Sequence, residues 1–372
     1  MYIVGREQEK YELQRLLKSS QSEFLAVYGR RRVGKTFLIR EYFNNKFTFY
    51  STGISRGSRK DQLVHFYESL QEYGLPTKYS TPNNWQEAFR LLQYVLETSK
   101  ERRKIVFLDE VPWMDTQKSD FLTAIDLFWN TWASARNDIF LIVCGSAASW
   151  MVKNLIRNRG GLHNRLTCQL NICPFTLKET KDYLYRHGIN WGIQTIAECY
   201  MILGGIPYYL QQLDKSFSLA QNIDRLFFRE AALLKNEYKQ LYHSLFKTSD
   251  DYLNIIQVLS TKRTGLTRDQ IGQKTKISNG GGLTRKLDEL EQCGFIRKYT
   301  TIGTRGQVYQ LIDFFSIFYL TFIKKGKMFD ESTWMHIQGS SLHNNWLGYS
   351  FERLCFAHLS QIRNALGISG IA

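Results

Sequence analysis

Short apolar runs alternate with amphipathic stretches through the first half of the chain. The runs are continuous, as is typical of strands buried on both faces, and occupy residues 24–28, 47–51, 104–108 and 139–144. Helical patterns lie between them at residues 35–43, 62–73 and 85–99. This alternation predicts a parallel sheet flanked by helices, with a further strand at residues 165–174.

The pattern changes in the second half of the chain. A helical pattern runs from residue 177 to about residue 242 and is broken by the sequence GGIP at residues 204–207. A compact unit with helices, a glycine and two β-like runs follows, and the last segment is helical and aromatic-rich. We expect four parts, which span residues 1–175, 176–247, 248–313 and 314–372.

The composition narrows the class of protein. Hydrophobic residues make up 43% of the 372 positions, which is enough for packed cores. The formal net charge of +15 favours a polyanionic partner, nucleic acid before a membrane. The six cysteines form no C-x-x-C pair, and the amino terminus lacks the apolar stretch of a signal peptide. We therefore expect a cytoplasmic protein without a membrane segment.

The sequence LAVYGRRRVGKTFLIREYF, residues 25–43, joins an apolar run to a helical pattern through a glycine-containing turn. It fits the pattern G-x-x-x-x-G-K-[ST], in which backbone N–H groups and the start of a helix face phosphate oxygens. Lys35 is expected to reach the β- and γ-phosphates, and Thr36 to ligate Mg²⁺. The motif predicts a nucleotide site at Gly29, Arg30, Arg31, Arg32, Val33, Gly34, Lys35, Thr36 and Phe37.

Three consecutive arginines occupy the middle of this loop. We expect Arg30, Arg31 and Arg32 to serve the surface of the loop rather than the phosphates themselves. The alternative for the whole motif is a glycine turn that caps a basic helix by chance. The strand pattern before the motif and the helical pattern after it favour the phosphate loop.

An acidic pair, Asp109 and Glu110, directly follows the apolar run at residues 104–108. Ligands bind at the carboxyl ends of parallel strands, so Asp109 is placed to hold Mg²⁺ through water. Glu110 is placed to orient and polarise the attacking water. Ser146 follows the next strand, which is expected between the two motifs in the sheet. It either contacts the γ-phosphate or the water, or caps the following helix.

Five motifs in this order, VGREQE, YGRRRVGKT, FLDEVPWM, IVCGS and GGIPYYL, resemble the archaeal-type AAA+ ATPases of the STAND-related branch. The resemblance covers most of the chain and implies that the nucleotide is ATP. It also implies that Val4, Gly5 and Arg6 lie near the adenine. Pro207 of GGIP would approach the base from a helical lid, and the alternative for GGIP is a simple helix break.

The resemblance also concerns the arginines that precede the fifth strand. AAA+ proteins often carry an arginine here that meets the γ-phosphate, and a guanidinium suits this task because it is always charged and bidentate. Arg165 is the candidate, either in cis as a sensor or in trans as a finger in a homo-oligomer. Arg157 and Arg159 are close competitors.

Residues 265–311 have the order of a winged helix-turn-helix. Thr267 is expected to cap a short helix, residues 278–282 to form the turn, and Gly294 to end a second helix. The core face of this second helix is expected at Leu283, Leu287 and Leu290. Residues 295–299 and 307–311 predict a hairpin, and its wing holds Gly303 and Arg305.

A basic face on this module predicts contact with double-stranded DNA. The expected DNA-contacting residues are Thr284, Arg285, Lys286 and Arg305. The three on the helix would approach the major groove, and the wing arginine the backbone or the minor groove. The alternative is a solvated helix face or a protein-docking module, because acidic residues share the helix at positions 288, 289 and 291.

The last segment, WLGYSFERLCFAHLSQIRNALGISGIA, resembles the opening helix of the nuclease-like domain that ends many members of this family. In that domain a helix glutamate, here Glu352, helps to bind metal together with an acidic pair and a lysine on later strands. This sequence does not contain those strands, and one carboxylate cannot assemble the Mg²⁺ site. We therefore expect residues 350–366 to pack as a structural remnant whose apolar face is open to a protein partner.

These patterns together predict a slow, regulated, Mg²⁺-dependent ATPase that acts as a switch on or near DNA. The expected fold class is an α/β P-loop NTPase sheet of the AAA+ type, followed by a helical lid, a winged helix-turn-helix and a short helical C-terminal segment. Lid closure over ATP, reset by hydrolysis to ADP, would change the orientation of the domains. The alternatives are a nucleotide-gated protein scaffold and a DNA translocase or helicase.

Overall fold

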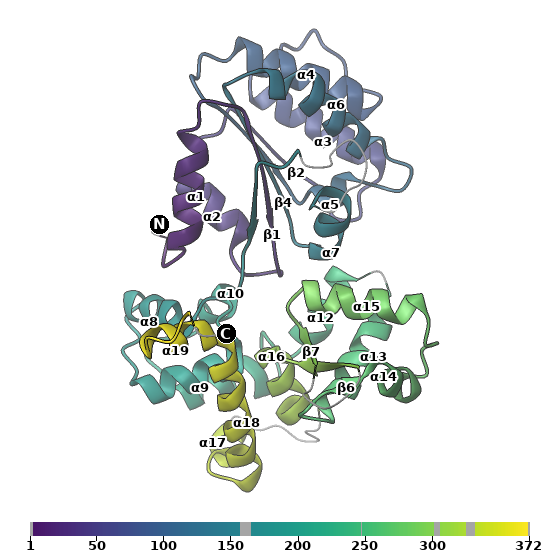
Figure 1. Cartoon of the computed structure of the whole chain (residues 1–372). Helices are drawn as coiled ribbons and strands as arrows, with labels where there is room; N and C mark the ends of the chain where they lie inside the picture. The colour runs from purple at the N-terminus through teal and green to yellow at the C-terminus, as the bar shows by residue number, and fades with distance from the viewer. Residues whose placement is uncertain (1–2, 157–164, 247, 301–305, 325–331, 371–372) are drawn as a thin grey trace. The chain divides into compact units, whose positions relative to one another are not determined.

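The computed structural model describes residues 3–156, 165–246, 248–300, 306–324 and 332–370 (Figure 1). The chain divides into two compact units, Met1–Cys173 and Pro174–Ala372. Within the described ranges, every helix is too short or too polar to cross a membrane.

The first unit is built on a parallel sheet. Its strands in the described residues are β1 (Glu23–Tyr28), β2 (Phe49–Thr52), β3 (Lys104–Asp109), β4 (Ile139–Gly145) and β5 (Cys168–Asn171). They lie in the order β2-β3-β4-β1-β5, and each neighbouring pair is parallel. This confirms the predicted α/β sheet. It also confirms that β4 lies between the strand before the phosphate loop and the strand before the acidic pair.

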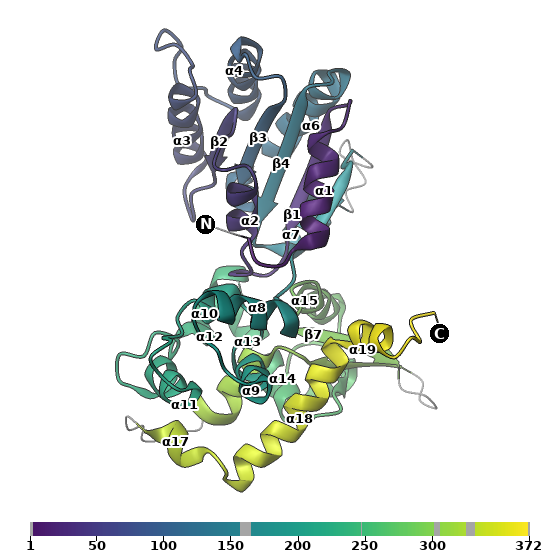
Figure 2. The same cartoon turned by 90° about the vertical axis from the view of Figure 1, so that its left-hand side faces the viewer.

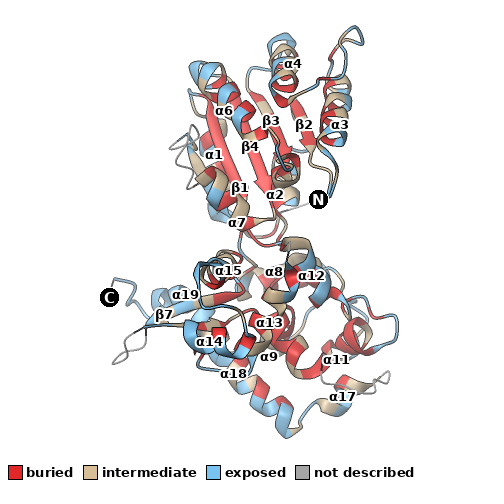
Figure 3. Cartoon of the chain, turned by 90° about the vertical axis from the view of Figure 1, so that its right-hand side faces the viewer, coloured by how far each residue is buried: buried red, intermediate tan, exposed pale blue. Residues whose placement is uncertain are grey.

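Helices cover both faces of this sheet. One face carries α1 (Glu7–Leu17) and α2 (Lys35–Tyr42), and the other carries α3 (Arg59–Glu72), α4 (Trp85–Thr98) and α6 (Phe121–Thr131) (Figures 1 and 2). Strands β1 and β4 are buried along almost their whole length (Figure 3). Beneath α3, α4 and α6 the core contains many aromatic rings among its aliphatic side chains, namely Phe24, Phe49, Phe66, Trp85, Phe89, Phe121, Phe128 and Trp129.

The predicted strands agree closely with β1 to β4, whereas β5 is shorter than the predicted run at residues 165–174. β5 pairs only with β1, over residues 168–171, so its ladder ends where that single neighbour ends. The predicted helices do not include α1 and α6. Helix α1 buries Leu13 and Leu16, and α6 buries Phe121, Ala124, Ile125, Phe128 and Trp129.

The second unit begins with a run of helices. In the described residues these are α8 (Leu177–Arg186), α9 (Ile193–Leu203), α10 (Pro207–Leu210), α11 (Leu219–Ile223), the single turn η3 (Asp224–Phe228) and α12 (Glu237–Leu245). A capping box starts α8, because the Thr176 side chain accepts the N–H of Glu179 and the Glu179 side chain accepts the N–H of Thr176. The helical segment predicted after the sheet is therefore present.

A small antiparallel sheet with three helices follows. The strands β6 (Leu266–Thr267), β8 (Gln307–Leu311) and β7 (Ile296–Thr300) lie in the order β6-β8-β7. The helices are α13 (Ser249–Ser260), α14 (Arg268–Thr275) and α15 (Gly281–Gln292). The predicted cap at Thr267 is present. The predicted core leucines of α15 are all buried, namely Leu283, Leu287 and Leu290.

Two details of this region refine the prediction. Helix α15 begins at Gly281, inside the turn expected at residues 278–282. Gly294 follows the helix with a φ of 71°, as expected for a glycine that ends a helix. The expected wing arginine, Arg305, lies outside the described residues.

The C-terminal segment is part of the core of the second unit. It comprises α16 (Phe314–Phe318), the turn η4 (Tyr319–Ile323), α17 (Thr333–Ile337), α18 (Ser341–Ala357) and α19 (Leu359–Ala365). The buried carboxylate of Asp224 accepts the N–H of Trp334 at 2.6 Å, which joins η3 to α17. Rings of Trp334 and Trp346 pack edge-on against Phe322. By contrast, α19 buries none of its residues (Figure 3).

The two glycines of GGIP have different structural roles. Gly204 and Gly205 both have left-handed backbones, with φ values of 70° and 64°. A Cβ on Gly204 would meet no heavy atom closer than 3.6 Å. A Cβ on Gly205 would lie 2.4 Å from the carbonyl oxygen of Phe175 and 2.6 Å from the ring of Tyr200. The first glycine therefore ends α9, and the second permits a close approach of two backbone segments.

This difference predicts that Gly205→Ala destabilises the protein more than Gly204→Ala. Each substitution places a side chain at positive φ, which costs roughly 1 kcal/mol. Only at position 205 does the new methyl group also overlap a backbone oxygen and a buried ring, which adds about 2 kcal/mol. Urea titrations of the two variants measure the free energy of unfolding. Equal losses would show that the approach at Gly205 is not a constraint on the fold.

Candidate functional site

The loop between β1 and α2 depends on two glycines. Gly29 has a φ of 138°, and a Cβ there would lie 2.3 Å from the carbonyl oxygen of Ile172, just beyond β5. Gly34 has a φ of 88° and precedes the first residue of α2. The loop therefore folds back on the end of the neighbouring strand and delivers the amino end of α2 to the carboxyl edge of the sheet.

Lys35 is held inside this loop. Its side chain is only 4% exposed, and Nζ donates to the carbonyl oxygens of Gly29 at 3.1 Å and Arg30 at 2.9 Å. The Lys35 ammonium group is thus enclosed by the backbone of the phosphate loop. Of the neighbouring arginines, Arg31 is exposed, as expected for a residue on the loop surface, whereas Arg30 is buried.

A hydrogen bond joins the loop to the acidic strand end. The Thr36 hydroxyl donates to Oδ2 of Asp109 at 2.7 Å, and the N–H of Glu110 donates to Oδ1 at 2.9 Å. Thr36 and Asp109 are 73 positions apart in the sequence. A hydroxyl and a carboxylate are hard oxygen donors, and Mg²⁺ in such sites needs only one or two protein ligands beside phosphate and water. The residues present therefore fit a magnesium ion.

Burial raises the pKa of Asp109 above its ordinary value, because the charged carboxylate is poorly solvated at 4% exposure. The hydrogen bond from Thr36 opposes this shift, and the negative charge of Glu110 adds to it. Burial also raises the pKa of the adjacent Cys144 thiol. A cation beside Asp109 would favour its ionised form and oppose this shift.

Glu110 is held by the end of the next strand. Its backbone is left-handed, with a φ of 47°. The Ser146 hydroxyl donates to one carboxylate oxygen at 2.6 Å, and the Ser146 N–H donates to the other at 3.2 Å. The sequence placed Ser146 near the γ-phosphate or the attacking water, or at a helix cap. In the structure its hydroxyl and its N–H both bind the neighbouring carboxylate, which the motifs do not reveal.

Arg6 makes a second contact that the motifs do not reveal. It is 6% exposed and adopts a left-handed backbone with a φ of 59°. One terminal nitrogen, Nη2, donates to the carbonyl oxygens of Val33 at 3.1 Å and Cys173 at 2.7 Å. The segment with Val4 and Gly5 is therefore attached to the phosphate loop, where the sequence expected the adenine end of the site.

The remaining candidates are not part of this cluster of contacts. Arg165 is exposed and lies shortly before β5. Its competitors Arg157 and Arg159 lie outside the described residues. Pro207 belongs to the second unit, where it is the first residue of α10.

On α15, the residues predicted to contact DNA are only partly exposed, and each has a neighbouring partner in the structure. Arg285 is 71% exposed and lies 3.9 Å from a carboxylate oxygen of Glu289. Lys286 is 12% exposed and pairs with Asp251 at 3.4 Å. The Thr284 hydroxyl accepts a hydrogen bond from Arg268 at 3.2 Å.

Comparison with known proteins supports the interpretation of the first unit. Residues 3–213 match the model of a protein family described as an ATPase domain predominantly from Archaea. An uncharacterized protein of Methanocaldococcus jannaschii is 25% identical over 369 residues, which are 97% of this chain and 78% of that protein. An uncharacterized ATP-binding protein of the same organism is 42% identical over 44 residues, 12% of this chain and 75% of that protein.

Two solved structures share the fold. A Walker-type ATPase of Pyrococcus abyssi superposes with a TM-score of 0.60 at 18% identity, over 86% of this chain and 96% of that one. The ORC2 protein of Aeropyrum pernix, solved in ADPNP–ADP complexes, gives 0.53 at 12% identity, over 94% and 96%. At these identities the likeness concerns the fold alone, and it agrees with the order of strands in the first unit.

The environment of Asp109 predicts that Asp109→Asn stabilises the fold at neutral pH in the absence of divalent metal. The variant removes a buried charge and keeps the size of the side chain, so the free energy of unfolding should rise by about 1 kcal/mol. A carboxylate with a raised pKa binds more protons when folded than when unfolded. The parent should therefore gain stability as the pH falls from the raised pKa towards about 3.9, and the variant should not.

Urea titrations of both proteins across this pH range, with EDTA present, measure the difference. A variant that is less stable than the parent at every pH would show that the carboxylate stabilises the site without a cation.

Proposed function

Because the chain belongs to the family of ATPase domains found predominantly in Archaea, we propose that it binds ATP with Mg²⁺ and hydrolyses it slowly, as a molecular switch. The observation that carries this proposal is the hydrogen bond between Thr36 of the phosphate loop and Asp109 of β3. It brings a phosphate-binding motif and an acidic strand end to one edge of the sheet. The ADPNP–ADP complexes of the ORC2 neighbour support a nucleotide as the ligand of this fold.

The residues would divide the task as follows. Backbone N–H groups of residues 29–36 and the amino end of α2 would bind the phosphates. Lys35 would leave its two carbonyl acceptors and place its charge on the β- and γ-phosphates. Thr36 and Asp109 would hold Mg²⁺, which neutralises charge on the phosphate oxygens when it is bound.

We assign the general base to Glu110 and its control to Ser146. The Glu110 carboxylate accepts two hydrogen bonds from Ser146, which directly follows β4. The same pair fixes the direction in which the carboxylate faces. Turnover would therefore depend on how Ser146 holds Glu110, which agrees with a slow and regulated ATPase.

The other nucleotide contacts follow from the resemblance and from the position of the amino-terminal segment. Val4, Gly5 and Arg6 would lie beside the adenine, since Arg6 is bound to the phosphate loop through Val33. Pro207 would reach the base from the helical lid, residues 176–247. Arg165, which is exposed, is free to meet a γ-phosphate either in its own chain or in a second copy.

We further propose that residues 248–313 form a winged helix that binds double-stranded DNA. The order of α13, α14, α15 and the β7–β8 hairpin supports this assignment. The exposed Arg285 is the strongest candidate for a phosphate contact, whereas Lys286 would first have to leave Asp251. The acidic partners on and beside α15 favour the second candidate function, a nucleotide-gated scaffold that binds a protein.

The ATPase proposal predicts that variants of the site affect ATP binding and ATP hydrolysis separately. Lys35→Ala should abolish ATP binding, because it removes the ammonium group that is expected to bind the β- and γ-phosphates. Glu110→Gln should retain binding and slow hydrolysis about a hundredfold or more, since it removes the general base. Ser146→Ala should change the rate without changing the affinity.

Fluorescence titration with a labelled ATP analogue and a steady-state phosphate-release assay, each with and without Mg²⁺, make the measurements. Arg31→Ala is the matched control, because it removes an exposed cation from the same loop. Unchanged affinity in Lys35→Ala would refute the phosphate-loop assignment, and a parental rate in Glu110→Gln would refute the assignment of the base.

The DNA proposal predicts a change in salt dependence. Replacing Arg285, Lys286 and Arg305 by alanine should weaken duplex binding at low salt. The slope of log affinity against log salt should fall by about one unit for each DNA phosphate that the variant no longer neutralises. A control with the same loss of charge replaces Lys178, Lys181 and Arg186, which belong to α8. If both triple variants bind duplex DNA alike over a salt series, this face is not the DNA surface and the scaffold function is preferred.

A further inference from the structure

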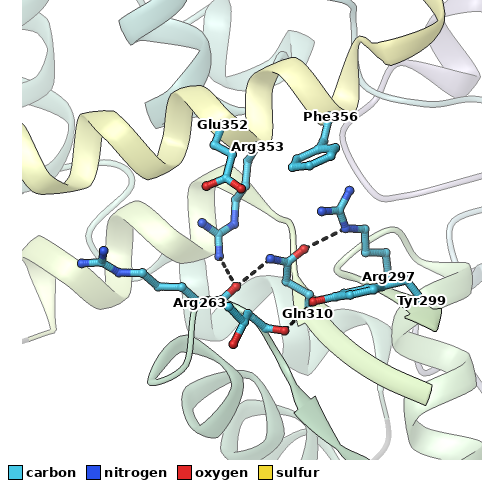
Figure 4. A pocket seen from close by; sticks show the side chains of 8 residues that line it. Arg263, Arg297, Tyr299, Gln310, Glu352, Arg353 and Phe356 are labelled. Carbon is cyan, nitrogen blue, oxygen red and sulfur yellow. Dashed lines mark hydrogen bonds between the residues drawn. The ribbon is translucent and has the colours of Figure 1, made fainter. Parts of the chain in front are cut away.

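The second unit contains a pocket of about 350 Å³ that is distinct from the phosphate loop (Figure 4). It lies between the β7–β8 hairpin, the turn after α13 and the last two turns of α18. Among the described residues that line it are three arginines, two aromatic residues and one carboxylate. These six are Arg263, Arg297, Arg353, Tyr299, Phe356 and Glu352.

The alternation of side chains along β7 explains why a cation and a ring face this pocket. Arg297 and Tyr299 point to the side of the hairpin that faces α18. Lys298, between them, points to the opposite side, where it pairs with Asp288 at 3.9 Å and Glu291 at 3.1 Å. The acidic residues of α15 therefore pair with Lys298 and not with Arg297 in the pocket.

The guanidinium groups are held in place by a few of their donors. Arg353 donates from Nε to the carbonyl oxygen of Leu311 at 3.1 Å and from Nη2 to that of Arg263 at 3.4 Å. Arg297 donates from Nε to the side-chain oxygen of Gln310 at 2.8 Å. Gln310 in turn donates to the carbonyl oxygen of Arg263 at 2.6 Å. A guanidinium has five N–H donors, so most of those on Arg297 and Arg353 stay available to an anion.

The pocket has more positive than negative charge. Its one carboxylate in the described residues, on Glu352, forms no ion pair within 4 Å with any of the three arginines. Burial lowers the pKa of Arg353, the nearby charge of Glu352 opposes this shift, and the charges of Arg297 and Arg263 add to it. Like charges stay close together at lower energy when an anion lies between them.

Aromatic rings lie beside these cations. The guanidinium of Arg297 lies 4.6 Å from the ring centroid of Phe356 and 5.7 Å from that of Tyr299. The Tyr299 hydroxyl donates to the carbonyl oxygen of Thr264 at 2.5 Å, which fixes that ring. Phe356 is 46% exposed. An exposed ring next to phosphate-binding guanidinium groups is the combination that binds a base and its phosphate together.

We propose that this pocket binds a nucleoside phosphate, with the phosphate on Arg297 and Arg353 and the base against Phe356. The volume suits one nucleotide unit. That unit is either a free nucleotide or the phosphorylated end of a single strand. The proposal does not depend on ATP binding by the first unit.

The test uses the full chain with Lys35→Ala, so that the phosphate loop does not add a second nucleotide signal. Calorimetric titrations with inorganic phosphate and with thymidine 5′-monophosphate measure the free ligands. Fluorescence anisotropy measures a short oligothymidylate with a 5′-phosphate and a 3′-dye. Tighter binding of the strand than of the monophosphate would identify a strand end as the ligand, and equal binding would identify the free nucleotide.

Variants then locate the site. Arg297→Gln should weaken the binding of every phosphate probe about tenfold, and Arg297→Lys should recover part of this loss. Phe356→Ala should weaken the nucleotide probes about tenfold and leave inorganic phosphate unchanged. Arg353 is left intact because it holds two backbone carbonyls. The matched control is Arg363→Gln, which removes an exposed arginine of α19 that does not line the pocket.

Three results would overturn the proposal. The first is that no probe binds to the Lys35→Ala chain. The second is that Arg363→Gln weakens binding as much as Arg297→Gln, which would mean diffuse attraction of anions. The third is that Phe356→Ala leaves the nucleotide probes unchanged, which would remove the base from the site. Circular dichroism of each variant confirms that the loss is not due to unfolding.

Discussion

The candidate site depends on one constraint, which is that all five described strands of the first unit run in the same direction. Because their carboxyl ends meet at one edge, three segments that are far apart in the chain lie beside each other. These are the loop after β1, the acidic pair after β3 and Ser146 after β4. The hydrogen bonds that join these three segments, from Thr36 to Asp109 and from Ser146 to Glu110, require this convergence.

Much of the first unit could be predicted from the sequence, because a strand that is buried on both faces has a simple, continuous apolar sequence. Every residue of β4 is buried, so its sequence is a continuous apolar run. Lys35 and Thr36 were also predictable, since a phosphate loop is a local structure with a fixed spacing of residues. Asp109 required one more rule, that ligands lie at the carboxyl ends of parallel strands.

The contacts that were not predicted are those between side chains distant in sequence. Ser146 and Glu110 are 36 positions apart, and Arg6 and Val33 are 27 apart. No periodic pattern of residues predicts such pairs, because a single polar residue at a strand end has several plausible partners. The same reason applies to Lys286, which in sequence belongs to a basic helix face and in the structure pairs with Asp251 of α13.

The two hydrogen bonds that Nη2 of Arg6 donates connect the phosphate loop to the end of the first unit. This nitrogen binds the carbonyl oxygen of Val33, in the phosphate loop, and that of Cys173, the last residue of the first unit. Gly29 adds a second point of contact, because its backbone rests against Ile172, one residue earlier. A shift of the loop that preserves these contacts would also move Ile172 and Cys173, where the chain leaves the first unit. The guanidinium of Arg6 therefore couples the position of the phosphate loop to that of the peptide that leads to the second unit.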